Sequence, residues 1–364
     1  MSINLRAENQ IAPDLNAQAY VELSGVRKDY AGVTAVHNLT LSITRGEFLS
    51  LLGPSGCGKT TTLRLIAGLD CLSGGAIAID SRLVSTPTLF VPPEQRGVGI
   101  VFQDYALFPH MTVFENISFG LYGRSRVLMK RRVEELLELV GLSGEGKKYP
   151  HELSGGQRQR VALARSLAPS PSVILLDEPF SNLDAELRTV LRHETKEILK
   201  AGGATVILVT HDQEEAFSLS DRVGLLNAGR LEQLGTPYQI YHHPASRFIA
   251  DFVGKADFIP STVQGGFIVS KLGRFPYDGP SYPDSAAVEL MIRPDDVSIV
   301  PDPQGEAVIA EVLFLGADAL YCLELPDKTC LHSFGLSAKL MPKGLRVKIN
   351  VNLAHTIVFP ASGS

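Results

Sequence analysis

A glycine-rich segment, Gly53-Pro-Ser-Gly-Cys-Gly-Lys-Thr60, constrains the fold of this chain more than any other feature. It fits the pattern G-x-x-x-x-G-K-[ST], follows the apolar run Phe48–Leu52 and precedes apolar residues at helical spacing, which is the context that this motif requires. Its glycines let successive backbone N–H groups turn inward around phosphate oxygens, at a helix N-terminus whose dipole favours anions. The segment therefore predicts a phosphate-binding loop between a buried strand and a helix.

Side chains of this loop complete the predicted phosphate site. Lys59 would place a cation on the β- and γ-phosphates of a nucleotide, and the Thr60 hydroxyl would ligate Mg²⁺. The residues predicted to bind nucleotide here are Gly53, Pro54, Ser55, Gly56, Cys57, Gly58, Lys59, Thr60 and Thr61.

A second apolar run, Val173–Leu176, ends in two adjacent acids, Asp177 and Glu178. Burying a carboxylate at the end of a strand costs free energy unless a cation or hydrogen bonds compensate it. Alone, such a pair is more often an ordinary helix start, but beside a phosphate loop it indicates a nucleotide triphosphatase. We predict that Asp177 binds Mg²⁺ and that Glu178 is the general base for the attacking water.

The segment Leu153-Ser-Gly-Gly-Gln157 predicts a second helix start with exposed backbone donors. One chain does not need two anion-binding helix starts for one nucleotide. The economical interpretation is that Ser154–Gln157 caps the nucleotide bound to another copy of the chain.

With this motif the chain resembles the ATPase subunits of ABC transporters, whose signature is Leu-Ser-Gly-Gly-Gln. The resemblance implies a homodimer of head-to-tail subunits with ATP and Mg²⁺ between them. It also implies that Tyr30 stacks on adenine, that Gln103 contacts Mg²⁺ and water in a loop facing the membrane partner, and that His211 senses the γ-phosphate. The predicted catalytic residues are Glu178, His211, Lys59 and Gln103, the predicted metal ligands are Thr60, Gln103 and Asp177, and the other predicted nucleotide-binding residues are Tyr30, Ser154, Gly155, Gly156, Gln157 and Asp184.

The patterning of the chain predicts two domains after an N-terminal extension of residues 1–19. Residues 20–255 alternate strands and helices, which favours an α/β P-loop ATPase core with a helical subdomain. Residues 256–364 contain short apolar segments separated by Gly, Pro and Asp, which predicts a small all-β barrel of the OB or TOBE-like kind with a regulatory role. The apolar runs predicted as strands are Phe48–Leu52, Val173–Leu176, Thr205–Val209, Phe267–Val269, Val288–Ile292, Val308–Phe314, Tyr321–Leu325 and Arg346–Val351.

Composition excludes several classes of partner. The net charge is −5 with no block of Lys and Arg, so nucleic acid is not expected as a partner. No apolar run approaches the roughly 18–20 residues that cross a bilayer, so membrane association is expected only through a partner. The cysteines show no C-x-x-C spacing, so neither a disulfide nor a zinc site is expected; they are Cys57, Cys71, Cys322 and Cys330. We predict reduced structural thiols for all of them except Cys57, whose backbone is expected to matter in the phosphate loop.

Segments near the end of the core resemble ABC importers with an appended C-terminal domain, which handle sugars, polyamines, sulfate, molybdate and ferric iron. These segments are Gly235–Tyr241, Pro244–Gly254 and Ile292–Val297. Phe252–Pro260 and Pro92–Pro109 most resemble ferric-iron importers. The resemblance implies an ATPase subunit of such an importer, peripheral at the cytoplasmic face of the inner membrane through an integral permease, and indirectly served by a solute-binding protein.

The alternatives are the same ATPase role in a polyamine, sulfate or sugar importer, or a non-transport ABC ATPase. DNA-repair relatives insert long coiled coils between the phosphate loop and the signature, and no heptads lie there in this chain. Translation relatives carry two cores, and this chain has one. Asn182 departs from the alanine common in this family, and we interpret His242-His243 as surface residues rather than iron ligands.

Overall fold

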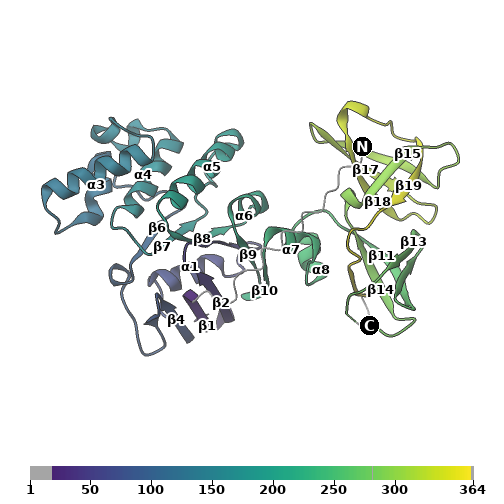
Figure 1. Ribbon diagram of the computed structural model, residues 1–364, viewed down its shortest axis with the longest axis horizontal. Helices are drawn as coiled ribbons and strands as arrows, with labels where there is room; N and C mark the ends of the chain where they lie inside the picture. The colour runs from purple at the N-terminus through teal and green to yellow at the C-terminus, as the bar shows by residue number, and fades with distance from the viewer. Residues whose placement is uncertain (1–18, 281, 362–364) are drawn as a thin grey trace, which may run out of the picture. The chain divides into compact units, whose positions relative to one another are not determined.

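The structure is a computed structural model that describes residues 19–280 and 282–361 (Figure 1). The predicted N-terminal extension lies outside the described residues except for Ala19. The described chain forms two compact units, of which the first ends at Leu234 and the second begins at Gly235. The boundary expected at residues 255 and 256 stays a prediction.

A six-stranded sheet in the order β10-β9-β3-β8-β7-β6 carries the predicted motifs. Its strands are β3 (Phe48–Leu52), β6 (Val98–Val101), β7 (Val173–Asp177), β8 (Thr205–Thr210), β9 (Arg222–Asn227) and β10 (Arg230–Gly235). β3 pairs in parallel with β8 and β9, and β7 pairs in parallel with β6 and β8. Since the carboxyl ends of parallel strands meet at one edge of a sheet, the segments that follow β3, β7 and β8 are brought together there.

A second, antiparallel sheet covers the phosphate-loop helix α1 (Lys59–Ala67). Its strands, in the order β2-β1-β4-β5, are β1 (Ala19–Tyr30), β2 (Val33–Thr44), β4 (Gly74–Ile79) and β5 (Arg82–Ser85). Leu63 and Ile66 of α1 belong to the same buried cluster as Leu23 of β1 and Leu175 of β7. The helix is therefore fixed by packing against both sheets.

A helical part, whose buried cluster also includes side chains of the six-stranded sheet, makes up the rest of this unit. Its helices are α2 (Val113–Ser118), α3 (Arg126–Leu139) and α4 (Gly155–Leu167), and α5 (Ala185–Ala201) and α6 (Gln213–Leu219) follow along the chain. Figure 1 shows α3 and α4 side by side and apart from α1. The apolar spacing of Val133, Leu136 and Leu137 predicts α3, and these side chains are buried. Gly141, in a left-handed conformation (φ 67°), follows its end.

The second unit begins with two short helices, α7 (Pro237–His242) and α8 (Arg247–Phe252), and continues in two five-stranded sheets. One sheet has the order β13-β12-β11-β14-β20 and the other β15-β19-β16-β17-β18. The strands are β11 (Asp257–Gln264), β12 (Phe267–Ser270), β13 (Gly273–Pro276), β14 (Ala287–Ile292), β15 (Val297–Pro301), β16 (Ala307–Phe314), β17 (Asp318–Glu324), β18 (Cys330–Leu336), β19 (Arg346–Val351) and β20 (Val358–Pro360). Both sheets contribute to one core, with Ile259 from the first and Tyr321 from the second. The predicted fold class is confirmed.

Short 3₁₀ turns connect these elements at η1 (Pro93–Gln95), η2 (Phe119–Leu121), η3 (Glu145–Lys147), η4 (Pro150–Glu152), η5 (Pro294–Asp296) and η6 (Ser337–Lys339). Among the described helices, none combines the length and the apolar character that a membrane span requires.

Arg293, at the end of β14, joins this strand to helices α7 and α8. Its guanidinium donates hydrogen bonds to the carbonyl oxygens of Ala250 (2.9 Å), Gly254 (2.9 Å), Lys255 (3.2 Å) and Tyr241 (3.0 Å). The side chain is 2% exposed. These bonds satisfy carbonyl groups at and beyond the ends of the two helices, where no intrahelical donor remains.

The prediction of reduced thiols is wrong for Cys322 and Cys330. Cys322 and Cys330 form a disulfide across the hairpin of β17 and β18, with their Cα atoms 6.0 Å apart. Cys57 and Cys71 are free. The spacing along the chain gave no sign of this pair, because the register of the hairpin decides which side chains become neighbours.

Candidate nucleotide-binding site

The loop between β3 and α1 needs glycine at two positions. A Cβ atom on Gly53 (φ 158°) would lie 2.1 Å from the carbonyl oxygen of Leu226. One on Gly58 (φ 98°) would lie 2.4 Å from the carbonyl oxygen of Ala35. Only a residue without a side chain fits between these backbones and leaves the loop free to wrap an anion.

Lys59 is held inside this loop. Its Nζ atom donates hydrogen bonds to the carbonyl oxygens of Gly53 (2.8 Å) and Pro54 (2.9 Å), and the residue is 5% exposed. The Cys57 Sγ atom lies 3.8 Å from the same Nζ, but burial raises the pKa of the Cys57 thiol. The loop thus presents one ammonium group and a neutral thiol.

Thr60 and Asp177 offer oxygen donors at the end of β7. The Thr60 hydroxyl donates a hydrogen bond to Asp177 Oδ1 at 3.2 Å. Burial raises the pKa of the Asp177 carboxyl; the Thr60 hydrogen bond opposes this rise, and the charge of Glu178 adds to it. A bound divalent cation would offset that desolvation. A hydroxyl and a carboxylate are the hard oxygen ligands that Mg²⁺ prefers, so these residues fit the ion.

The structure brings Glu178 and His211 into contact. Glu178 Oε2 lies 3.1 Å from His211 Nδ1, at the adjacent ends of β7 and β8. Glu178 has a left-handed backbone conformation (φ 45°), and its N–H donates to the carbonyl oxygen of Val209 at 2.9 Å. Backbone strain of this kind at a non-glycine residue concentrates at functional sites, where the surrounding structure fixes it. The histidine side chain is 55% exposed and that of Glu178 is 22% exposed.

Gln103 lies in the turn after β6, with an exposed side chain. The Asn182 Nδ2 atom donates a hydrogen bond to the Gln103 carbonyl oxygen at 3.0 Å. This bond ties the turn of Gln103 to the loop of residues 181–184 that follows β7. Asn182 therefore has a defined partner, which an alanine at this position would lack.

Asp184 and Ser154 each cap a helix in this chain. Asp184 Oδ1 accepts a hydrogen bond from Leu187 N–H at 2.9 Å, at the start of α5. Ser154 and Gln157 form a capping box: the Ser154 hydroxyl accepts from Gln157 N–H (3.2 Å), and Gln157 Oε1 accepts from Ser154 N–H (3.0 Å). Across the described residues no hydrogen bond or ion pair joins residues 154–157 to residues 53–61, and Figure 1 shows α4 apart from α1. One chain does not bring the two predicted halves of the site together.

Tyr30 ends β1 and is 40% exposed. Its hydroxyl donates a hydrogen bond to Asp70 Oδ2 at 2.9 Å, and the same carboxylate pairs with Arg64 Nε at 2.9 Å. The Lys28 Nζ atom lies 4.6 Å from the ring centroid. Sequence reasoning missed Asp70 as the partner of Tyr30, since nothing in the residues around either position indicates the contact.

Arg165, near the end of α4, holds the turn that contains Gln103. Its guanidinium donates to the carbonyl oxygens of Tyr105 (2.9 Å) and Ala106 (2.6 Å), and its Cζ atom lies 5.5 Å from the Phe108 ring centroid. Tyr105 and Ala106 both have positive φ angles, 63° and 46°. Sequence reasoning missed this role as well. An arginine within the otherwise apolar run that begins at Val161 was the available signal.

A hollow next to this turn has apolar walls. We name it the Phe119 hollow; its volume is about 590 Å³, and its lining residues are His110, Met111, Glu115, Ser118, Phe119, Tyr122 and Met129. Phe119 is 55% exposed and Tyr122 is 98% exposed. Large exposed aromatic side chains around a hollow are typical of surfaces that bind another protein.

Comparison with known proteins identifies similar sequences and structures. Residues 36–181 match the ABC transporter family model, and residues 290–359 match the TOBE domain model. The sulfate/thiosulfate import ATP-binding protein CysA 2 of Chromobacterium violaceum is 49% identical over 296 residues, 80% of this chain and 80% of that protein. The Fe(3+) ions import ATP-binding protein FbpC 2 of Rhizobium meliloti is 52% identical over 266 residues, 72% of this chain and 66% of that protein.

Two further matches extend these similarities. The spermidine/putrescine import ATP-binding protein PotA of Thermobifida fusca is 41% identical over 364 residues, 93% of each chain. A solved structure of a dimeric ATP-binding cassette in a post-hydrolysis state, bound to ADP and phosphate, is 35% identical with a TM-score of 0.53. It covers 60% of this chain and 98% of its own.

Proposed function

Because this chain belongs to the ATP-binding subunits of ABC importers, we propose that it hydrolyses ATP at a seam between two of its copies, with Glu178 as base and His211 as switch. The observation that carries the proposal is the 3.1 Å contact between Glu178 Oε2 and His211 Nδ1, beside the Thr60–Asp177 pair. A carboxylate held by an imidazole next to a phosphate loop is positioned to orient a water molecule toward a γ-phosphate.

Each residue of the site has a separate proposed role in phosphoryl transfer. When ATP binds, Lys59 Nζ exchanges its hydrogen bonds to the loop carbonyl oxygens for contacts with the β- and γ-phosphates. The N–H groups of the glycine-rich loop donate hydrogen bonds to the same phosphates. Thr60, Asp177 and Gln103 would hold Mg²⁺, which would supply positive charge to offset that of the phosphates. His211 fixes the Glu178 carboxylate, and Tyr30 stacks on the adenine.

The second copy supplies the other half of the site. Among the described residues, residues 154–157 make no hydrogen bond to the phosphate loop, and the capping box leaves out the N–H groups of Gly155 and Gly156, which could face an anion. We propose that Ser154–Gln157 of one copy caps ATP on the loop of the other, in a head-to-tail dimer. ATP then binds the closed dimer with higher affinity than the open one, so binding closes the dimer and hydrolysis reopens it.

The transport partner is proposed to be an integral permease at the cytoplasmic face of the inner membrane. The turn of residues 103–110 and the Phe119 hollow form a surface of exposed aromatic side chains next to the catalytic turn. A permease segment seated there would contact the element that carries Gln103. This surface supports peripheral attachment to the membrane through the permease. A solute-binding protein would act on the permease and would serve this chain only indirectly.

The imported solute is proposed to be ferric iron. The support is the 52% identity with the ferric-iron relative and the segments Phe252–Pro260 and Pro92–Pro109. Relatives named for sulfate and for polyamines match over longer parts of the chain, and they define the competing outcomes of the test.

Uptake measurements test both the role of the ATPase site and the identity of the imported solute. Cells lacking this chain are complemented with wild type or Glu178→Gln and assayed for uptake of radiolabelled ferric citrate, sulfate and spermidine. We expect wild type alone to restore ferric uptake. Restoration of sulfate or spermidine uptake instead would replace the solute and keep the ATPase role. Equal rescue by Glu178→Gln would overturn the role of the site.

A further inference from the structure

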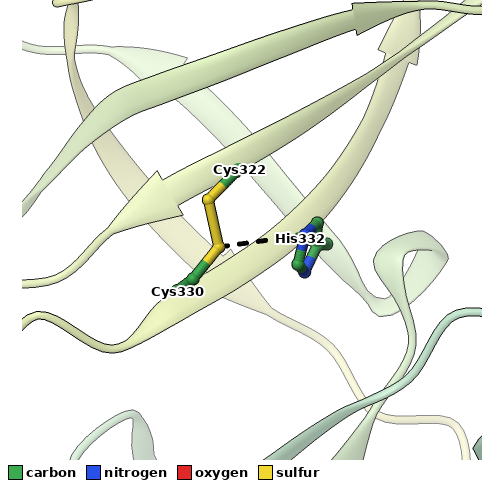
Figure 2. Close-up of side chains that lie close together, drawn as sticks. All are labelled: Cys322, Cys330 and His332. Carbon is green, nitrogen blue, oxygen red and sulfur yellow. Dashed lines mark hydrogen bonds between the residues drawn. A yellow bond between two sulfur atoms is a disulfide. The ribbon is translucent and has the colours of Figure 1, made fainter.

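Three side chains with metal-binding atoms gather on one face of the β17–β18 hairpin. Cys322 lies directly opposite His332 in the register of the two strands, and Cys330 lies two residues before His332 on the same face. Their ligand atoms all lie within 4.8 Å of one another. Figure 2 shows the two sulfur atoms joined and the imidazole of His332 directed toward Cys330. The group lies in the C-terminal unit, outside every residue assigned to ATP.

Asp257 fixes the orientation of His332. Asp257 Oδ1 lies 2.8 Å from His332 Nδ1, and Oδ2 accepts a hydrogen bond from the His332 backbone N–H at 2.6 Å. The Asp257 side chain is 9% exposed. A carboxylate on Nδ1 assigns the ring proton to that nitrogen, so the lone pair of Nε2 faces the sulfur atoms, 3.8 Å from Cys330 Sγ. This arrangement of carboxylate, histidine and metal-ligand atoms recurs in zinc proteins.

We propose that reduction of the Cys322–Cys330 disulfide opens a Zn²⁺ site made by both sulfur atoms and His332 Nε2. A dithiol reductant transfers two electrons and two protons to the disulfide and becomes a disulfide itself, which leaves two free thiols here. Zn²⁺ then displaces one proton from each thiol and binds the two thiolates and the neutral imidazole. A disulfide oxidant that takes two electrons from the two thiolates, and is itself reduced to a dithiol, re-forms the Cys322–Cys330 bond and releases Zn²⁺, so occupancy follows the redox state of the hairpin.

The donor set favours this ion over the proposed cargo. Thiolate and imidazole ligands suit Zn²⁺, whereas hard cations take oxygen ligands. Two Zn–S bonds of about 2.3 Å and one Zn–N bond of about 2.0 Å place tetrahedral ligand atoms roughly 3.5–3.8 Å apart, close to the 3.8 Å between Cys330 Sγ and His332 Nε2. Three protein ligands leave one position for water. The inference does not depend on which solute the importer carries.

Zinc titration of the full chain tests the site. The chain is reduced with a phosphine, freed of reductant without oxygen, and titrated with Zn²⁺ against a chromophoric chelator. We expect one tight equivalent in wild type and in Cys71→Ser, a matched control with an exposed free thiol outside the cluster. Cys322→Ser and Cys330→Ser should each bind at least about 100-fold more weakly, and Asp257→Asn about 10–100-fold more weakly. Oxidised wild type should lack this equivalent.

A second measurement tests the site in the wild-type chain, so its result does not depend on whether the cysteine variants fold. In the reduced wild type, Zn²⁺ should slow alkylation of Cys322 and Cys330 but not of Cys71, as read by mass spectrometry of peptides. Co²⁺ in place of Zn²⁺ should give a sulfur-to-cobalt charge-transfer band that disappears on oxidation. Unprotected thiols, or equal Zn²⁺ affinity in wild type and in the double variant Cys322→Ser, Cys330→Ser, would overturn the proposal.

Discussion

Arg165 donates a hydrogen bond from its guanidinium to the backbone carbonyl oxygen of Tyr105, over 2.9 Å. Arg165 lies on α4, the helix that begins at the Ser154 cap, and Tyr105 lies two residues after Gln103 in the turn that follows β6. The helix proposed to cap the partner's ATP and the turn proposed to face the permease are therefore joined by charge-assisted hydrogen bonds. We therefore expect a movement of α4 at the proposed dimer seam to shift this turn.

Replacing this arginine should weaken binding to the permease without weakening binding of ATP. Arg165→Ala removes the donors to Tyr105 and Ala106, each bond to a charged group contributing about 1.5–3 kcal/mol. We expect ATP affinity of the isolated subunit to stay within about two-fold, and affinity for the permease to fall at least about 10-fold. Binding to the permease in detergent, by surface plasmon resonance, measures this. Arg132→Ala, which removes a donor to the carbonyl oxygen of Leu167 at the same end of α4 without touching the turn of Tyr105, is the control. Unchanged permease affinity in Arg165→Ala would contradict the coupling.

Glu178→Gln should bind ATP but hydrolyse it about 10²–10⁴-fold more slowly, the usual contribution of a general base. The amide keeps the size of the side chain and a hydrogen bond to His211, but it cannot accept the proton of the attacking water. Steady-state phosphate release and ATP-dependent dimerisation by light scattering are the measurements. Glu197→Gln, an exposed acid on α5, should behave as wild type. Turnover of Glu178→Gln within a few-fold of wild type would remove Glu178 from its role.

Lys59→Ala should weaken nucleotide binding itself. The ammonium group lies against the loop backbone, and its hydrogen bonds to the carbonyl oxygens of Gly53 and Pro54 also hold the loop in shape. We expect the ATP dissociation constant to rise at least about 10-fold in isothermal calorimetry, as for loss of one bond to a charged group. Lys200→Ala, an exposed lysine at the end of α5, should leave it unchanged. Equal affinity in both variants would argue against the loop assignment.

Arg293→Ala should destabilise the C-terminal unit by roughly 3 kcal/mol or more, since it leaves four buried or part-buried carbonyl oxygens without this donor. Arg293→Lys should lose most of this stability as well, because a single ammonium group cannot reach acceptors on both α7 and α8. Urea unfolding followed by fluorescence of the tyrosines measures the change. Arg230→Ala, an exposed arginine on β10, serves as control. A loss below about 1 kcal/mol in Arg293→Ala would show that other contacts hold the two helices.

The position of the phosphate loop, Asp177 and His211 at one sheet edge could be predicted from the sequence. Each follows an apolar run long enough for a buried strand, and parallel pairing then places their ends together. Because the side chains of these motif residues are themselves the groups expected to bind phosphate, metal or water, their residue types and their order in the chain were enough to predict where they lie.

Contacts that depend on backbone atoms or on strand register could not be predicted. Arg165 and Asn182 both bind main-chain carbonyl oxygens, which every residue possesses, so no side-chain pattern marks their partners. The cluster of Cys322, Cys330 and His332 depends on the register of one hairpin, and Asp257 reaches it from 75 residues away. A shift of one residue in that register would place Cys322 on the opposite face of its strand from the other two.

Three histidines in the C-terminal unit predict a loss of stability in mild acid. The ring centroids of His243 and His355 lie 4.3 Å apart, and those of His242 and His355 lie 6.2 Å apart. Burial lowers the pKa values of His242 and His243 below the ordinary value of 6.5, and the charge of His355 lowers both further, while Asp295 opposes the change at His242. The unfolded chain then binds protons at a higher pH than the folded chain does. Their contribution to stability is present above the ordinary pKa and is lost as the pH falls through the lowered values.

The urea concentration at which half of the wild-type C-terminal unit is unfolded should therefore decrease as the pH is lowered from about 7.5 to about 5.5, the window around an ordinary histidine pKa. The double variant His242→Gln, His243→Gln should show a smaller fall, because it removes the two groups whose protonation is disfavoured by folding. Burial raises the pKa of the Asp296 carboxyl, which acts in the opposite sense, but near the lower pH at which carboxyls titrate. His151→Gln, on the N-terminal unit, controls for loss of a histidine elsewhere. Parallel pH profiles in wild type and the double variant would exclude the histidine cluster as the cause.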